Sequence, residues 1–265
     1  MKVDVSILAD SQNDETGDRL TTFLLSNFPK CLLAELNTHR MLSRNAASSR
    51  AMPIDRIIEQ IMETPFIPQW TAHSKGMVGT DTLTVENRQR ATAEWLALRD
   101  KAIASVKKFK DLGIAKQNAN RALEPWITVP VIVSGTDWDN FFKLRTAIDT
   151  QPEFRGFACE MQSQMLNSKP KLLIAGDWHI PLSSDNLPQR DRLKSSVAMC
   201  ARGSYGSFTG HSELSRDVVL HDRLMESGHW SPFEHQAYCC EGHHANYQGW
   251  RSYRNTLQPF TSLSL

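Results

Sequence analysis

The sequence predicts a fold that combines β-strands with longer α-helices, and three segments indicate it. Residues 3–9 alternate between apolar and polar side chains, as a half-buried strand does, and residues 20–25 form a second strand candidate that ends at Asn27-Phe28-Pro29. Between residues 81 and 112 large apolar side chains recur on one helical face, and Gly113 supplies a stop signal. The apolar residues of this helix are Trp95, Leu98, Ile103, Val106 and Phe109. We expect them to pack on the core.

Further helices are predicted along the chain, separated by polar or proline-rich connections. They span residues 31–42, 54–62, a segment after Thr136-Asp137 that carries Arg145, 152–165, 192–202 and 211–226. Thr136-Asp137 is expected to cap its helix, Pro152 suits a first helical turn, and Gly228 ends the last helix. The helix at 31–42 is expected to run into a polar loop.

The size and charge of the chain limit the classes of ligand to consider. With 265 residues the chain is long enough for one large domain over 1–265, which we prefer to two small ones. Its 30 Lys and Arg residues nearly balance 29 Asp and Glu residues, for a formal net charge of +1. No nucleic-acid partner is therefore expected, and an anionic ligand should be small and held locally.

The sequence also predicts a soluble cytoplasmic protein without a membrane partner or a metal. No run of eighteen apolar residues occurs, and the N-terminal residues lack the apolar core of a signal peptide. The five cysteines form no C-x-x-C pair, so neither a zinc site nor a disulfide framework is indicated. His229 and His243-His244 lack the partner spacing of a metal site.

Residues 38–50 are the segment most informative about function. Three arginines stand there among Ser and Asn residues, which all donate hydrogen bonds. Such donors suit a phosphorylated ligand, because an arginine can hold a phosphate through two parallel hydrogen bonds. On composition alone, a solvated loop rich in small polar residues explains the segment equally well.

The spacing within this segment resembles the signature of the flavin-dependent thymidylate synthases. The chain reads H-R-x-x-S-x-N-x-x-S-x-R from His39 to Arg50, where the family has R-H-R-x-x-S-x-N-E-x-S-x-R. Two positions differ, since the leading Arg is Thr38 here and the Glu is Ala46. These differences bear on the substrate more than on membership of the family.

Two later segments resemble further blocks of the same family. Arg121 precedes Leu123-Glu124-Pro125, like an Arg before a Leu-Pro turn, and residues 140–145 read N-F-F-K-L-R, close to N-F-L-x-L-R. Thr150-Gln151-Pro152-Glu153 then stands where the family has A-Q-x-E. Taken singly, each arginine is more often an ordinary surface residue. In the family the first contacts the nucleotide, and the second lies against the uracil ring and favours loss of its N3 proton.

The C-terminal third carries motifs that the family has near its N-terminus. Residues 231–235 read S-P-F-E-H, and Ala201-Arg202-Gly203-Ser204 resembles the block A-R-x-S. This order indicates a circular permutation, in which the opening segment of the family has become the closing segment. The family's spacing from this Glu to the first signature Arg leads from Glu234 to Arg254. We therefore hypothesise that Arg254 supplies the guanidinium missing at Thr38; the alternative is a tail residue without a role.

The resemblance implies a role for each matched residue. The catalytic residue would be Arg145; the flavin would contact His39, Arg40, Asn140, Ser231 and Glu234; and the nucleotide would contact Thr38, Ser48, Ser49, Arg50, Arg121, Arg145 and Arg254. The implied subunit is α+β and assembles as a homotetramer, with FAD and the nucleotide bound where subunits meet.

The implied reaction is the reductive methylation of dUMP to dTMP. Methylenetetrahydrofolate would donate the carbon, FAD would carry the hydride, NADPH would be the reductant, and no nucleophilic cysteine would be needed. Two alternatives stay open. Thr38 and Ala46 remove two charged groups, which favours another pyrimidine deoxynucleotide such as dCMP, or hydroxymethylation. A nucleotide-binding homologue that has lost catalysis would hold no flavin.

Overall fold

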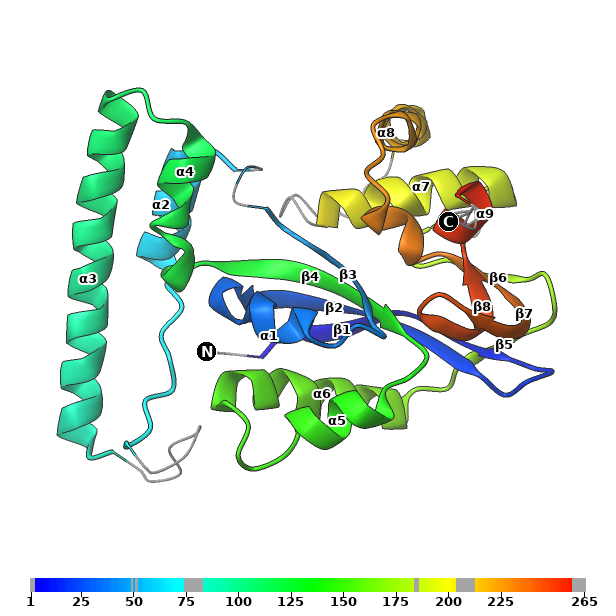
Figure 1. The fold of residues 1–265 in the computed structure, drawn as a ribbon, viewed down its shortest axis with the longest axis horizontal. Coiled ribbons are helices and arrows are strands. Elements are labelled where there is room, and N and C mark those ends of the chain that lie inside the picture. Colours follow the sequence, from blue (N-terminus) through cyan, green and yellow to red (C-terminus); the bar gives the residue numbers. More distant parts are fainter. Residues whose placement is uncertain are drawn as a thin grey trace, which may run out of the picture.

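The computed structural model describes residues 3–258 except 49, 51, 74–82, 184–185 and 204–212 (Figure 1). Ser49 and Ser204, which the sequence analysis singled out, lie outside the described residues. The described ranges combine two sheets with helices, so the predicted α+β fold is confirmed. No helix in these ranges is both long and apolar enough to cross a membrane.

A five-stranded sheet of order β3-β4-β2-β1-β5 forms the centre of the fold. Its strands are β1 (Val5–Asn13), β2 (Arg19–Pro29), β3 (Ser43–Ala46), β4 (Thr128–Gly135) and β5 (Lys171–Leu173). All neighbours pair antiparallel except β5, which runs parallel to β1. In Figure 1, α5 (Asp139–Arg145) and α6 (Pro152–Asn167) lie below this sheet, and α7 (Gln189–Gly203) and α8 (Leu214–Glu226) lie above it.

The second strand is longer than its sequence predicts. It does not end at Asn27 but continues to Pro29, with a bulge between Leu25 and Phe28 where it pairs with β4. Pro130 of β4 lies opposite this bulge and has no paired residue in β2, which is a position where a strand tolerates proline. The sequence analysis did not predict β4 at all, and pairing with this neighbour is what extends β2.

The signature segment is partly a strand, which corrects the predicted helix and loop. Only a 3₁₀ turn at Lys30–Leu32 and the short helix α1 (Leu33–Asn37) form in place of a helix over 31–42. Residues Ser43–Ala46 then pair with β4 as β3. The pairing satisfies the backbone polar groups of a segment whose polar composition is typical of a loop. One edge of the sheet therefore holds the central signature residues rigidly.

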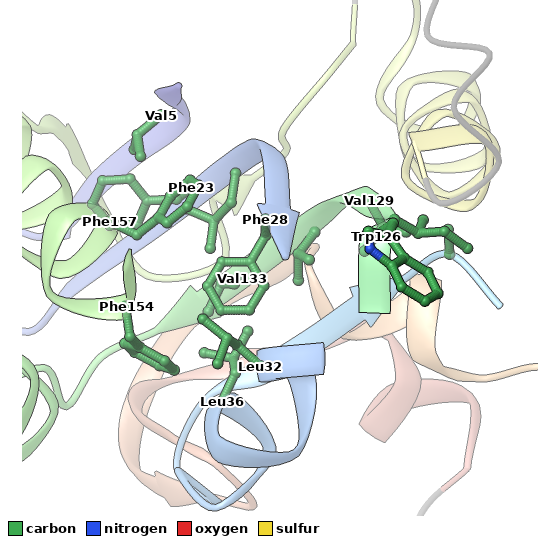
Figure 2. Packing of buried hydrophobic residues seen from close by; sticks show 14 of the residues in the cluster. Val5, Phe23, Phe28, Leu32, Leu36, Trp126, Val129, Val133, Phe154 and Phe157 are labelled. Atoms are coloured by element: carbon green, nitrogen blue, oxygen red, sulfur yellow. The ribbon is translucent and has the colours of Figure 1, made fainter. Parts of the chain in front are cut away.

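The main core lies between the sheet and α6 (Figure 2). Phe23 and Phe28 of β2 meet Phe154 and Phe157 of α6, and all four rings are at most 2% exposed. The ring centroids of Phe28 and Phe154 lie 5.5 Å apart in an edge-to-face arrangement. Burying each such side chain contributes roughly 1.5–3 kcal/mol. This packing fixes the start of α6 against the signature side of the sheet.

Three helices lie beyond the end of the sheet, on the left of Figure 1, and their buried apolar side chains belong to the same core. They are α2 (Ile54–Glu63), α3 (Val85–Asp111) and α4 (Lys116–Arg121). The predicted core face of α3 is only partly correct: Ile103 and Val106 are buried, but Leu98 and Phe109 remain 52% and 37% exposed. Gly113 follows α3 with a φ of +71°, as its role as a stop signal predicts.

The C-terminal third builds a second sheet and returns to the signature. Strands β6 (Trp178–His179), β7 (Ala237–His244) and β8 (Tyr247–Ser252) pair in that order, and α9 (Tyr253–Leu257) follows. A 3₁₀ turn at Ser231–Glu234 contacts β3. The displaced S-P-F-E-H block and the signature are therefore neighbours in space. The circular permutation itself remains a prediction.

Candidate functional site

The first of three clusters around the signature is built on Arg145 and His39. Arg145 is the last residue of α5, whose N-cap is Trp138 rather than the predicted Thr136-Asp137. Its Nε donates to His39 Nε2 at 2.8 Å, and its guanidinium carbon lies 4.6 Å from the centroid of the Phe154 ring. Its Nη2 lies 3.4 Å from Thr38 Oγ1 and from the carbonyl oxygen of Glu35. The structure thus joins three residues of the predicted site.

The charges in this cluster are arranged for an anionic ligand. Burial, together with the positive charges of the nearby Arg145 and Arg44, lowers the pKa of His39 to about 4, so the imidazole is neutral at physiological pH. Because Nε2 accepts from Arg145, the ring proton is on Nδ1. An imidazole, a hydroxyl, a carbonyl and an aromatic face hold the guanidinium, and all are neutral. Its positive charge therefore remains available.

The second cluster joins β3 to the C-terminal block. Asn45 Nδ2 donates to the carbonyl of Cys200 at 2.8 Å, and Ser231 Oγ donates to Asn45 Oδ1 at 3.4 Å. Glu234 pairs with Arg254, with 2.5 Å between Oε1 and Nη1. A cavity of about 210 Å³ lies here, and Ser43, Glu234 and Arg254 are among its lining residues.

Within this chain Arg254 pairs with Glu234, and no described contact joins it to Thr38. Its guanidinium pairs with Glu234 beside β3, whereas the guanidinium that reaches Thr38 is that of Arg145. Arg254 starts from α9, which packs on the 3₁₀ turn that carries Glu234. The arginine therefore supports the middle of the signature rather than its beginning. Its contact with the nucleotide stays a prediction.

The third cluster lies at the end of the signature. Ser48 and Arg50 are exposed, and the backbone N–H of Arg50 donates to Ser48 Oγ at 3.3 Å. Lys30 Nζ donates to the carbonyl of Ala47 at 2.9 Å, and Arg121 lies close enough to lower the pKa of Lys30. Sequence reasoning missed Lys30, because only the course of β2 and β3 brings it to the signature.

Two predicted flavin contacts lie at the surface. Arg40 and Asn140 are both exposed, one in the turn after α1 and the other in the first turn of α5. Among the described residues, no hydrogen bond or ion pair links either side chain to the three clusters. Their roles therefore remain predictions.

Comparison with known proteins identifies the family. The model of the family described as thymidylate synthase complementing protein (Thy1) matches residues 20–171. The chain belongs to this family. The match includes the Thy1 signature, Arg121 and Arg145, whereas Ser231, Glu234 and Arg254 lie outside it.

Solved structures add a likeness in fold to the Thy1 match. The UMP/dUMP methylase PolB from Streptomyces cacaoi bound with 5-Br UMP is similar at a TM-score of 0.50 and 15% sequence identity, over 63% of this chain and 89% of that chain. The same enzyme bound with 5-Br dUMP gives 0.46 and 16%, over 63% and 91%. No curated protein matches the sequence.

A buried hydrogen-bonded chain supports the Thy1 signature from behind. It comprises Ser11 Oγ, His179 Nδ1 and Nε2, Thr22 Oγ1, Ser134 Oγ and His235 Nδ1, with successive contacts of 2.9, 2.8, 2.8 and 2.8 Å. Ser134 pairs with Ser43 of β3, and His235 follows Glu234. Burial lowers the pKa of both His179 and His235 to about 3. Both rings are neutral, and sequence reasoning missed the chain.

Four of the five cysteines are poorly suited to act as nucleophiles. Burial raises the pKa of Cys31 to about 11 and that of Cys200 and Cys239 to about 12, and it also raises the pKa of Cys240. The thiolate is the reactive form, so these thiols are largely unreactive near neutral pH. Cys31 is the one that lies next to the third cluster, directly after Lys30.

Proposed function

We propose that this protein is a flavin-dependent enzyme that methylates dUMP to dTMP, with methylenetetrahydrofolate as carbon donor and NADPH as reductant. The observation that carries the proposal is Arg145, held against neutral His39 and the face of Phe154 at the start of the family signature. A fixed guanidinium in this setting stabilises the oxyanion that develops when a uracil ring loses its N3 proton.

The order of the clusters along the signature indicates which residues would hold each part of the nucleotide. Ser48, Arg50 and Arg121 would hold the phosphate, and Ser49 joins them by its place in the motif. Arg145 and Thr38 would hold the base. The contacts of Arg145 orient its planar donors before substrate arrives, which reduces the entropic cost of binding in the reactive geometry.

The donor set of the chain fits a flavin. Exposed Arg40 and Asn140 offer N–H groups of the kind that phosphates and ring carbonyls accept, and Ser231 and Glu234 lie beside β3. FAD supplies the hydride-transfer chemistry when it is bound. Arg254 holds the Glu234 carboxylate in one orientation, so that its second oxygen can accept a hydrogen bond from the cofactor.

The proposed assembly is a homotetramer in which sites form where subunits meet. Exposed apolar side chains on α3, Leu98 among them, agree with burial against another subunit. Measuring the mass in solution by light scattering tests this, and a monomer that is active would contradict it.

Release of tritium from C5-labelled dUMP tests the reaction. Purified protein with FAD, methylenetetrahydrofolate and NADPH should release tritium from dUMP and form dTMP. UMP and dCMP are run in parallel, because Ala46 leaves the signature without its Glu and favours a second candidate, modification of another pyrimidine nucleotide. Release only from dCMP or UMP would overturn dUMP as substrate. A protein that binds nucleotide but no flavin on reconstitution would be a binding homologue instead.

A cysteine variant tests whether the reaction proceeds without a cysteine nucleophile, as the proposal requires. Because the pKa of Cys31 is raised to about 11, we expect Cys31→Ser to change kcat for tritium release by less than about threefold. Loss of all turnover, with the fold intact by circular dichroism, would show that a cysteine nucleophile takes part.

A further inference from the structure

Lys30 is placed to hold one end of the last part of the signature. It follows β2 directly, and its backbone N–H donates to the carbonyl of Ile127 at 3.0 Å, which fixes the start of the side chain. Its Nζ then donates to the carbonyl of Ala47 at 2.9 Å. The ammonium has three N–H groups, so this contact leaves donors for another group.

Asn120 holds the other end of the same segment. Its side chain is fully buried, and Nδ2 donates to the carbonyl of Met52 at 3.1 Å. Arg121 comes next in the chain. Residues 47–52, which include Ser48 and Arg50, are therefore attached at both ends to the scaffold by side chains that donate to backbone carbonyls.

The charges around Lys30 favour an anion. Burial lowers the pKa of Lys30, Glu124 raises it, and Arg121 lowers it again. Taking the Lys30 ammonium partly out of water costs free energy; Glu124 offsets part of this cost, and an anion bound beside Lys30 and Arg121 would offset more of it. A phosphomonoester carries up to two negative charges and several acceptor oxygens, and it matches such a pair of donors.

We propose that Lys30 is a positioning residue for phosphate recognition, which fixes Ala47 so that Ser48 and Arg50 face the phosphate and adds its own positive charge beside Arg121. The inference rests on the proposed function, because it names a further group at the same nucleotide site. Lys30 itself lies outside the signature motif, which spans residues 38–50.

Binding of dUMP and of its nucleoside deoxyuridine tests this role. Dissociation constants are measured by calorimetry for the full-length wild type, Lys30→Met, Lys30→Arg and the control Lys171→Met. Lys171 is an exposed lysine on β5, at the opposite edge of the sheet from β3. We expect Lys30→Met to weaken dUMP binding roughly ten- to hundredfold. Deoxyuridine binding should change less than about threefold, and Lys30→Arg and Lys171→Met should keep the wild-type preference for dUMP.

The outcomes separate the inference from the function on which it rests. A wild type that does not prefer dUMP over deoxyuridine would overturn both. A wild type with a clear preference that Lys30→Met retains would overturn the role of Lys30 alone. Lys30→Gln is the second variant in case methionine prevents folding. It loses the charge and shortens the reach to Ala47, so it should lose the preference as well, and an unchanged preference in this variant would also overturn the inference.

Discussion

Replacing Arg145 with Ala is expected to lower kcat for tritium release from dUMP about 10²- to 10³-fold, with a much smaller change in KM. The guanidinium is held by His39 Nε2 at 2.8 Å and by the face of Phe154, and neither contact neutralises it. In the proposed site the Arg145 guanidinium faces a uracil carbonyl. Negative charge develops on this carbonyl in the transition state and not in the bound substrate, so the guanidinium stabilises the transition state most. Steady-state kinetics with C5-labelled dUMP measures both constants.

Two further variants make this test specific. Arg145→Lys keeps the charge but loses the planar set of donors that reaches His39 and Thr38, so its kcat should fall between those of wild type and Arg145→Ala. Arg216 on α8 is an exposed arginine paired with Glu213, and Arg216→Ala should leave both constants unchanged. A rise in KM that accounts for the whole loss in Arg145→Ala would mean that the residue binds the ground state and transition state equally.

The functional motifs were easier to predict than the fold around them. The signature and the N-F-F-K-L-R segment are identified by residue type and spacing, which do not depend on knowing the tertiary structure. The predicted loop at the signature was wrong because β4 supplies a pairing partner for residues Ser43–Ala46. No local pattern shows this, since β4 lies about eighty residues later in the sequence and contains a proline that argues against a strand.

The supporting residues escaped sequence analysis for a related reason. Lys30 has the sequence context of an ordinary lysine after a proline, and only the path of β2 brings its Nζ to Ala47. His179 and His235 are far apart in the sequence and meet through Thr22 and Ser134 of the central sheet. Roles that depend on burial and on hydrogen bonds between distant strands are visible only in the structure.

The buried histidines predict a pronounced loss of stability in mild acid. His179 and His235 are at most 1% exposed, and burial lowers the pKa of each from 6.5 to about 3. In the unfolded chain each ring binds a proton as the pH falls below 6.5, whereas in the folded protein neither does so until about pH 3. Acid therefore favours the unfolded state, and the contribution of these two histidines to the free energy of unfolding should be constant above pH 7 and fall below pH 6.5.

The size of this effect follows from the interval between the two pKa values. At pH 5 each histidine should reduce the free energy of unfolding by roughly 2 kcal/mol, and the two together by about 4 kcal/mol. Asp10 lies near His179; burial raises the pKa of Asp10, but its contacts with Arg19 and other donors outweigh this and lower it from 3.8, so it titrates outside this range. Urea unfolding at pH 7.5, 6.5, 5.5 and 5.0 measures the slope.

Substitution of one histidine distinguishes the pH-dependent loss of stability, which comes from protonation, from the pH-independent loss caused by altering the core. His179→Gln removes one of the titrating groups, so the loss between pH 7.5 and 5 should drop by roughly 2 kcal/mol, whatever the stability of the variant at neutral pH; His39, whose pKa is also lowered, keeps its own share of the loss. His243 is exposed on β7, and His243→Gln should keep the full wild-type slope. A wild-type stability that stays flat down to pH 5 would mean that the rings of His179 and His235 take up protons in the folded protein. The hydrogen-bonded chain from Ser11 to His235 would then not be a closed, neutral support for the signature strand.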